Sequence, residues 1–444
     1  MSHVNKKIVH HTWGEGVVLA QRHDGYELFI KFDNGARSWI KRSECVYKDV
    51  PKGTVNFRDE SLYSDTKEEV NQEEEEKLLK IQALEALKLG IVPPHVREFI
   101  FGRDKEIKYF KKWFNDQTKN ACLVFGQYGT GKTHFLNYLK EMALKEEYAV
   151  SLCSVDPTES PLYKPLHVYE EIVKNFTYKN KKNFKDFINS IQKNSNNIEK
   201  KNQYIYNITK GDVNENLFWR WIKGENLVKT HHGFPSLFNY STSGNIFCNI
   251  LSFYGWFCKK FLDLNGFVIL FDEAEAIEFP TYNYRYVRSC NFFKGLRMTA
   301  ESNEELLSEN VSLSSPKTGY KTGLIYSGFA RSVKYLYDKK SYLKLVFAFT
   351  HSKDIINLCT EAGYENYIEL KRLSWESKVM AFNSIKKRYE ECYNLNINKS
   401  DEETVKDIVL KNDDDNIRAV VKKTIEALDL LRHYPDKNVR DILQ

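Results

Sequence analysis

Short apolar-rich and alternating runs near the start of the chain predict β-strands. They are separated by Asp-Gly and Asn-Gly turns and cover residues 16–21, 27–32 and 36–40. Asp-Gly and Asn-Gly between such runs are the strongest short sequence signals for a β-hairpin. We therefore expect residues 1–50 to form a small SH3- or Tudor-like β-barrel of about three or four strands.

A helical pattern follows a polar linker. Asp65 and Glu68 have the spacing of a capping box at its predicted start, and Gly90 with the two prolines after it ends it. Between them lies an apolar stripe made of Leu78, Ile81, Leu84 and Leu87. We expect a linker and a helix in residues 51–91.

From about residue 92 onwards, short apolar runs alternate with amphipathic stretches, which is typical of an α/β domain with a mainly parallel sheet. The runs expected to be buried strands are residues 121–125, 266–271 and 344–349. We expect this core in residues 92–364, with a Lys- and Asn-rich insertion at about 176–245, and a helical lid in residues 365–444. A further apparent strand at 323–329 leaves the strand order open.

The first of these strands leads into a candidate phosphate site. Residues 126–133 read GQYGTGKT and fit the P-loop pattern GxxxxGK[ST]. Glycines let the backbone turn tightly and direct its N–H groups at a phosphate, and the start of the following helix adds a partial positive charge. Lys132 would reach the β- and γ-phosphates, and Thr133 would hold Mg²⁺. The residues expected to bind the nucleotide are Gly126, Gln127, Tyr128, Gly129, Thr130, Gly131, Lys132, Thr133 and His134. The alternative to a P-loop is a glycine-rich turn that precedes an ordinary helix and binds no nucleotide.

A second apolar strand ends in two acids, Asp272 and Glu273. A P-loop ATPase needs such a strand, because Asp272 would bind Mg²⁺ and Glu273 would act as the general base toward the attacking water. The alternative is a capped helix start with these acids in its first turn. We expect ATP rather than GTP as the nucleotide.

Two further residues are candidates for contact with the nucleotide. Thr350 ends the third apolar strand, where a polar side chain can contact the γ-phosphate or the water; otherwise it caps the helix expected near Lys353. Arg418 lies at the start of a C-terminal helix, where a cation is unfavourable to the helix dipole unless an anion offsets it. The alternative for Arg418 is an exposed salt bridge.

Composition narrows the class of protein. The chain has 444 residues, 42 % apolar and 28 % charged, which is ordinary for a globular protein. No run approaches the roughly 20 apolar residues of a membrane span, and the start lacks the apolar core of a signal peptide. The eight cysteines form no CxxC pair, so we expect reduced thiols and a cytoplasmic location without membrane contact. A net charge of +6 is compatible with nucleic acid without indicating it.

Taken together, these segments resemble the ATP-binding proteins of BREX-type antiphage islands, which are P-loop ATPases close to the AAA+ and origin-recognition group. The resemblance spans roughly residues 92–435 and includes FGRDKE, GQYGTGKTHFL, FWRWIKGE and FDEAEAI, at residues 101–106, 126–136, 218–225 and 271–277. It implies an AAA+-like core, Mg-dependent ATP hydrolysis, a role in antiphage defence and a possible homo-oligomer. Residues 11–18, with Trp39, Ile40 and Lys41, resemble the Tudor-like C-terminal domain of UvrD-type helicases, which docks on protein or nucleic acid.

The chain also departs from this family. Lys132 and Asp272 lie about 140 residues apart, so an insertion separates them. The arginine cluster expected after the second motif is represented by Arg285, Arg288 and Arg297, each a candidate arginine finger or a packing residue. Tyrosines 282, 284 and 286 beside these arginines are candidates for stacking bases; an edge strand or packed loop is the alternative.

Three functions follow. The first is an ATP-driven switch or motor of antiphage defence that acts on DNA with partners such as a helicase. The second is a non-catalytic, ATP-locked scaffold or loader that recruits a helicase or transcription machinery. The third is a transferase or kinase, which the paired acids Asp272 and Glu273 disfavour. Glu273→Gln discriminates the first from the second.

Overall fold

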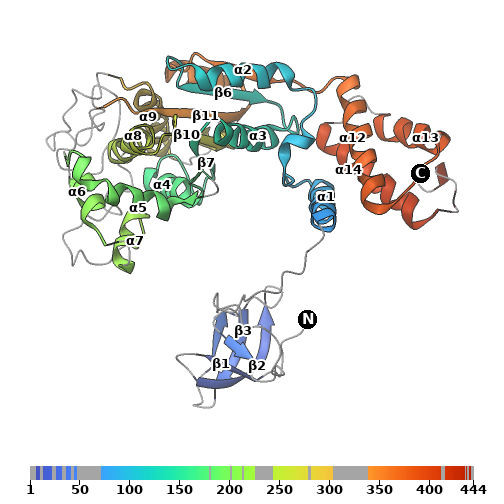
Figure 1. Cartoon of the computed structure of the whole chain (residues 1–444), viewed down its shortest axis with the longest axis horizontal. Coiled ribbons are helices and arrows are strands. Elements are labelled where there is room, and N and C mark those ends of the chain that lie inside the picture. Colours follow the sequence, from blue (N-terminus) through green and yellow to red (C-terminus); the bar gives the residue numbers. More distant parts are fainter. Residues whose placement is uncertain are drawn as a thin grey trace. The chain divides into compact units, whose positions relative to one another are not determined.

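The computed structural model describes residues 7–10, 14–22, 27–32, 37–41, 45–47, 72–179, 182–200, 203–212, 215–225, 244–278, 282–303, 339–411, 416–435, 437 and 440–441. They belong to two compact units, Met1–Asn71 and Gln72–Gln444 (Figure 1). Each unit is described by itself.

The first unit contains a five-stranded antiparallel sheet of order β4-β3-β2-β1-β5. Its strands are β1 (Lys7–His10), β2 (Gly14–Arg22), β3 (Glu27–Phe32), β4 (Arg37–Lys41) and β5 (Cys45–Tyr47). In β3, Leu28, Ile30 and Phe32 are buried while Lys31 is exposed, as the alternating pattern requires. The three predicted strands are present, and two short flanking strands, which carry no clear alternation, join them.

The second unit is built on a seven-stranded sheet of order β12-β6-β11-β10-β7-β8-β9. The strands are β6 (Ala121–Gly126), β7 (Tyr148–Ser154), β8 (Thr177–Tyr178), β9 (Lys182–Asn183), β10 (Gly266–Asp272), β11 (Leu343–Thr350) and β12 (Tyr367–Leu370). The five strands from β12 to β7 are parallel, and only the two short edge strands pair antiparallel. The predicted α/β core with a mainly parallel sheet is confirmed. The sheet also extends past residue 364, because β12 pairs with β6 before the helical region begins.

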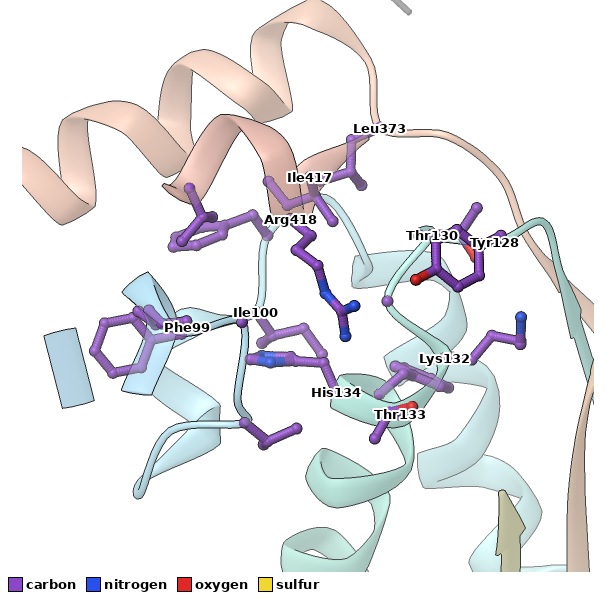
Figure 2. A pocket seen from close by; sticks show the side chains of 18 of the residues that line it. Phe99, Ile100, Tyr128, Thr130, Lys132, Thr133, His134, Leu373, Ile417 and Arg418 are labelled. Carbon is purple, nitrogen blue, oxygen red and sulfur yellow. The ribbon is translucent and has the colours of Figure 1, made fainter. Parts of the chain in front are cut away.

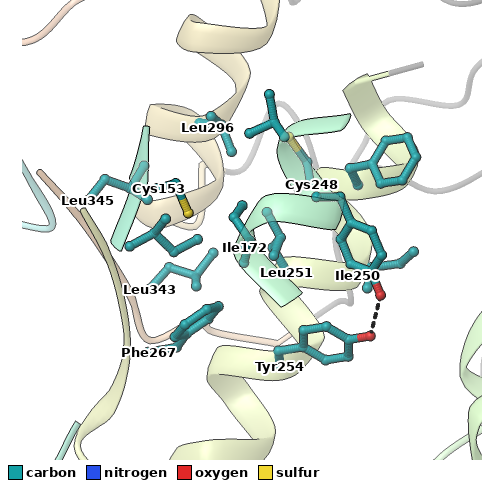
Figure 3. Packing of buried hydrophobic residues seen from close by; sticks show 14 of the residues in the cluster. Cys153, Ile172, Cys248, Ile250, Leu251, Tyr254, Phe267, Leu296, Leu343 and Leu345 are labelled. Atoms are coloured by element: carbon teal, nitrogen blue, oxygen red, sulfur yellow. Dashed lines mark hydrogen bonds between the residues drawn. The ribbon is translucent and has the colours of Figure 1, made fainter. Parts of the chain in front are cut away.

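Helices cover both faces of this sheet, which explains why its central strands are continuous apolar runs. One face packs on α2 (Asp104–Asn115) and α3 (Lys132–Lys145). The other packs on α4 (Pro165–Lys174), α8 (Gly244–Phe261) and α9 (Asn283–Ala300). Figure 3 shows this second core, where Phe267, Leu343 and Leu345 of the strands face helix residues. Within this core the hydroxyls of Tyr169 and Tyr254 lie 2.9 Å apart, and the Tyr169 hydroxyl also lies 2.7 Å from the Ile222 carbonyl oxygen.

The long interval between β7 and β10 is mainly helical in its described parts. After α4 it contains α5 (Phe184–Lys193), η4 (Ser195–Asn197), α6 (Gln203–Lys210) and α7 (Asn216–Ile222). Their apolar faces join the same core through Phe187, Ile208 and Trp221. Figure 1 shows α5, α6 and α7 at one end of the unit and the C-terminal helices at the other.

The C-terminal region is helical, as predicted. It contains α12 (Trp375–Tyr393), α13 (Lys399–Leu410) and α14 (Ile417–His433), and α11 (Lys353–Glu361) precedes β12. Ser374, Asn398 and Asn416 cap α12, α13 and α14, since each side chain accepts a hydrogen bond from the first turn.

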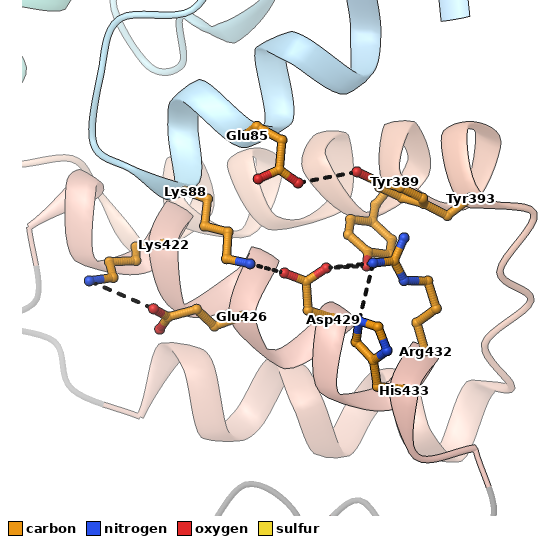
Figure 4. Close-up of polar contacts among 9 residues, drawn as sticks. All are labelled: Glu85, Lys88, Tyr389, Tyr393, Lys422, Glu426, Asp429, Arg432 and His433. Atoms are coloured by element: carbon orange, nitrogen blue, oxygen red, sulfur yellow. Dashed lines mark hydrogen bonds and ion pairs between the residues drawn. The ribbon is translucent and has the colours of Figure 1, made fainter. Parts of the chain in front are cut away.

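The predicted N-terminal helix is α1 (Gln72–Lys88), and it packs on α12 and α14. Lys88 Nζ lies 2.5 Å from Asp429 Oδ2, and the Tyr389 hydroxyl donates to the other oxygen of the same carboxylate (Figure 4). We call α12, α13 and α14 the lid, so α1 is attached to the lid.

Some predictions fall outside the described residues, namely the capping box at Asp65 and Glu68 and the apparent strand at 323–329. One alternative is wrong: Tyr284 and Tyr286 lie in the first turns of α9, with Tyr282 as its N-cap, and not in an edge strand or packed loop. Seven of the cysteines are free thiols: Cys122, Cys153, Cys248, Cys258, Cys290, Cys359 and Cys392. Within those residues, no helix combines the length and hydropathy of a membrane span.

Candidate nucleotide-binding site

The P-loop joins the end of β6 to the start of α3. Gly129 and Gly131 have φ angles of 78° and 90°, a region that favours glycine. A Cβ on Gly126 would lie 2.5 Å from Thr130 Oγ1, so this position has no room for a side chain. No side chain caps α3 and no acid lies in its first turn, so its free N–H groups can receive an anion.

A pocket of about 280 Å³ opens beside this loop (Figure 2). Its polar side is formed by the P-loop and by the side chains of Lys132, Thr133, Asp272, Glu273, Glu275 and Thr350. Its apolar side comes from Leu87, Gly90, Ile91 and Val92, from residues 99–101, from Leu373, and from the lid residues Ile385, Ile417 and Val421. One side thus suits phosphates and the other a flat, apolar group.

Lys132 and Thr350 are in direct contact, as expected for two residues that share one phosphate. Lys132 Nζ donates to Thr350 Oγ1 and to the Gly126 carbonyl, each at 3.0 Å. Thr350 in turn donates through its hydroxyl to Glu275 Oε1 and through its N–H to Glu275 Oε2 at 3.2 Å. The cap of α11 is Ser352, whose side chain accepts from Ile355 N, so the capping alternative for Thr350 is wrong.

The paired acids lie where β10 ends, next to the end of β7. The Asp272 carboxylate is buried, and burial raises its pKa, while a hydrogen bond from Thr133 opposes that rise. Glu273 has a φ of 54°, which directs its side chain away from the line of the strand. Its Oε2 accepts a hydrogen bond from Ser154 Oγ at 3.2 Å. Asp272 Oδ1 accepts a hydrogen bond from Glu273 N at 3.0 Å, and a short 3₁₀ turn, η6 (Ala274–Glu278), follows with Glu275 in its first turn.

Charge in the pocket is nearly balanced around Lys132. Burial lowers the pKa of this lysine, and the carboxylates of Glu275, Asp272 and Glu273 oppose the change. The lysine is thus held by carboxylates and hydrogen bonds in the position from which it can meet a phosphate.

Two more residues support the P-loop from outside it. Arg103 is buried, and its Nη2 donates to the Thr130 carbonyl at 2.8 Å while Nη1 pairs with Glu106. The His134 ring is enclosed near the 3₁₀ turn η3 (Val96–Phe99), and burial lowers the pKa of its imidazole to about 4. His134 is therefore neutral at pH 7.

The lid reaches the P-loop at the start of α14. A Cβ on Gly129 would lie 2.4 Å from Asn416 Nδ2, so loop and cap are in close contact. Arg418 is exposed. Its Nε would lie 3.5 Å from a Cβ on Gly90, so the two residues are in contact. Figure 2 shows its guanidinium pointing into the pocket, between His134 and the P-loop. Among the described residues it forms no ion pair, in contrast to the salt-bridge alternative.

Most of the predicted binding residues come together here. Tyr128 to His134, Arg418, Asp272, Glu273 and Thr350 all line the pocket, whereas Gly126 and Gln127 contribute carbonyls that hold Lys132 and Thr130. Arg285, Arg288 and Arg297 do not line it. Arg297 is engaged in packing, because its Nε donates to the Ala362 carbonyl at 2.7 Å and its Nη1 pairs with Glu301.

Sequence reasoning missed the roles of Ser154, Arg103 and Asn416. Arg103 lies in the FGRDKE segment of the family resemblance, which was its only signal, and Ser154 is the last residue of β7 and forms part of neither the P-loop nor the acid pair. Asn416 is a helix cap, as its residue type suggests. The role that was missed is its close contact with the P-loop at Gly129.

The oxygen donors fit Mg²⁺, which prefers carboxylate and hydroxyl oxygens and leaves several positions to phosphates and water. Thr133 and Asp272 both line the pocket, and Thr133 is near enough to the Asp272 carboxyl to lower its pKa. Within the described ranges no group of three or more His, Cys, Asp or Glu side chains is arranged as a metal cage. The residues therefore fit an ion shared with a nucleotide.

Comparison with known proteins agrees with this geometry. Residues 76–217 match the family model described as BREX system ATP-binding protein BrxC/D. The chain resembles the BREX ATP-binding proteins. The BREX match includes the P-loop and Ser154 and ends before the acids of β10. A comparison with curated protein sequences gave no match.

Three solved structures with which the chain can be aligned are distant in sequence. AMPPCP-bound DnaA from Aquifex aeolicus is 14 % identical with a TM-score of 0.33, over 77 % of this chain and 67 % of that chain. Drosophila ORC bound to DNA is 11 % identical with a TM-score of 0.36, over 81 % and 68 %. The E. coli MS115-1 HORMA:CdnC:Trip13 complex is 10 % identical with a TM-score of 0.33, over 86 % and 91 %. The P-loop, parallel sheet and helical lid make the BREX-like chain an AAA+-like protein in fold.

Proposed function

We propose that this chain binds ATP with Mg²⁺ in the pocket beside α3 and hydrolyses it, as an ATPase of a BREX-type antiphage system that acts on DNA in the cytoplasm with partners such as a helicase. The observation that carries the proposal is the convergence of Lys132, Thr133, Asp272, Glu273 and Thr350. They come from the carboxyl ends of three neighbouring parallel strands, which is where open α/β sheets bind ligands.

Each residue has a role in this proposal. The N–H groups at the start of α3 and the Lys132 ammonium hold the β- and γ-phosphates, and the apolar side of the pocket receives the base. Thr133 and Asp272 would hold Mg²⁺, which when bound neutralises charge on the phosphate oxygens. Glu273 accepts a proton from the water that attacks the γ-phosphorus, and the bond to the ADP oxygen breaks. Thr350 and Arg418 orient the γ-phosphate.

The test is ATP hydrolysis by the full chain, with and without single- and double-stranded DNA. Glu273→Gln removes the base but keeps the shape, so it should bind ATP and lose turnover by at least about 100-fold. The matched control is Glu403→Gln on the exposed side of α13, which should hydrolyse ATP as the unsubstituted chain does. Full turnover by Glu273→Gln would refute the assignment of the base.

One contact favours a second candidate, an ATP-locked scaffold or loader without turnover. The hydrogen bond from Ser154 to Glu273 occupies a carboxylate oxygen that the proposed reaction needs. For this alternative, we expect tight ATP binding, no hydrolysis with either kind of DNA, and the same result for Ser154→Ala. Turnover that appears or rises in Ser154→Ala would instead favour the ATPase.

A further inference from the structure

A group of tyrosines and arginines around the start of α9 takes no part in the pocket. We call it the Tyr–Arg cluster; it consists of Tyr163, Tyr282, Tyr284, Arg285 and Arg288. The rings of Tyr282 and Tyr284 lie 5.8 Å apart at an interplanar angle of 27°, and they are 54 % and 52 % exposed. Two neighbouring large rings that remain this exposed are available to an outside partner.

The cations of the cluster rest on these rings. The Arg285 guanidinium lies 4.9 Å from the ring centre of Tyr282, 5.0 Å from that of Tyr163 and 5.8 Å from that of Tyr284. Its Nε also donates to the Tyr284 hydroxyl at 3.2 Å. These contacts hold the arginine and the rings in one surface, since cation–π contacts are favourable even at exposed sites.

The cluster carries positive charge that no described carboxylate neutralises. Arg288 lies 5.3 Å from the Tyr284 ring centre, and within the described residues neither Arg285 nor Arg288 forms an ion pair. The first turn of α9 contains no acid. Arg297, further along the same helix, differs because it pairs with Glu301. The unpaired guanidinium groups and open rings match a ligand with phosphates and flat bases.

We propose that the Tyr–Arg cluster binds single-stranded nucleic acid, with bases stacked on Tyr282 and Tyr284 and phosphates paired with Arg285 and Arg288. Exposed aromatic rings interleaved with cations are how proteins hold unpaired strands, because every base has a face that can stack. In a duplex the bases stack on each other and are not open to the rings. The inference deepens the proposed function and rests on its action on DNA.

The position of the cluster gives it a link to the ATP site. Tyr163 follows β7 and Tyr282 follows β10, and these strands are parallel neighbours whose last residues are Ser154 and Asp272. The same two strand ends hold the Ser154–Glu273 hydrogen bond. Nucleic acid bound to the cluster would therefore contact the segments that follow β7 and β10. The ends of these two strands position Glu273, the proposed base.

The experiment measures binding of a fluorescent dT20 oligonucleotide, and of a duplex of the same length, by fluorescence anisotropy with the full chain. Tyr282→Leu/Tyr284→Leu removes both rings and keeps apolar bulk. Stacking on one ring contributes a factor of about 5 to 150 in affinity, so the double variant should bind dT20 at least about 10-fold more weakly. Arg285→Gln/Arg288→Gln should make dT20 binding less dependent on salt. The slope of log K against log salt should decrease in magnitude by about 0.7 for each phosphate contact that is lost.

Tyr434→Leu is the matched control, because Tyr434 is also exposed and has a lysine, Lys437, 4.8 Å from its ring centre. It should leave dT20 binding unchanged. Equal binding by the double tyrosine variant and the unsubstituted chain would overturn the proposal, as would equal decreases in the variant and the control. Unchanged dT20 binding together with a change of oligomeric state, by light scattering, would also overturn it and assign the cluster to a subunit contact.

Failure of this inference can be separated from failure of the proposed function. If the unsubstituted chain hydrolyses ATP but binds neither oligonucleotide, the action on DNA and the cluster are both refuted while the ATPase stands. If it binds dT20 and the tyrosine variant binds equally, only the cluster is refuted. Both tyrosines are exposed, so the melting temperature of the variant should match that of the unsubstituted chain and shows that a loss of binding is not a loss of fold.

Discussion

Thr350 offers the sharpest test of the polar side of the pocket. Its hydroxyl accepts from Lys132 Nζ and donates to Glu275, so it is the only atom that connects the two charged groups in the described structure. Thr350→Val removes this hydroxyl and keeps the shape of the side chain. Lys132 retains the Gly126 carbonyl and Glu275 retains the Thr350 N–H, so neither charge loses all of its partners.

The size of the effect follows from these hydrogen bonds. A hydrogen bond to a charged group contributes about 1.5–3 kcal/mol. If the loss falls on the position of Lys132 in the transition state, then kcat decreases by about 10- to 150-fold, because each 1.36 kcal/mol is a factor of ten. The affinity for ATP should change much less, since the N–H groups of α3 and the apolar side of the pocket are unaffected.

The assay is steady-state ATP hydrolysis together with ATP binding by fluorescence or calorimetry. Thr350→Ser keeps the hydroxyl and is the matched control, and we expect it to retain kcat within about threefold. Circular dichroism and the melting temperature establish that both variants are folded. A kcat for Thr350→Val equal to that of the unsubstituted chain, or an equal decrease in Thr350→Ser, would refute the role of the hydroxyl.

Two further predictions concern stability. Burial lowers the pKa of His134 to about 4 from about 6.5, so the unfolded state binds more protons between these values and the free energy of unfolding should decrease by up to about 1.4 kcal/mol per pH unit on acidification from pH 6.5 to 4. Urea unfolding at pH 7 and pH 5 checks this, and His134→Gln should reduce the pH dependence; an unchanged dependence in the variant would contradict it. Asp429→Asn weakens the contacts with Lys88 and Tyr389 and should lower the free energy of unfolding by about 1–2 kcal/mol, since the lysine is about a third exposed. Glu426→Gln, which breaks the exposed pair with Lys422 in Figure 4, should cost less than about 0.5 kcal/mol in the same urea assay, and equal decreases would show that burial of Asp429 is unimportant.

The parts of the fold that sequence reveals are those with local signals. The strands β6, β10 and β11 were predicted because buried parallel strands are continuous apolar runs bounded by glycine or polar residues. The P-loop has a fixed spacing, and the acids after β10 follow directly from the end of that strand. Helical periodicity is another local signal: Val420, Val421, Ile425 and Leu428 have this spacing and are buried in α14.

What sequence could not reveal depends on contacts between distant segments. Arg103 binds the Thr130 carbonyl across 27 positions, and Ser154 binds Glu273 across 119, without any periodic signal. The position of β12 beside β6 depends on the order of all the strands, which a linear pattern does not contain. An edge strand or packed loop was an alternative for the tyrosines at the start of α9, because tyrosine favours strands and the N-cap, Tyr282, makes no side-chain cap hydrogen bond.

The packing of α1 has a mechanical consequence for the whole chain. Leu84 and Leu87 of α1 pack with Ile385, Val421 and Leu428, and Lys88 pairs with Asp429, so α1 is fixed to the same helices that carry Arg418. The first unit is covalently joined to the second through this helix, and hence to the lid and not to the sheet. A tilt of the lid as Arg418 meets a phosphate would therefore carry α1 with it and displace Gln72, where the second unit begins.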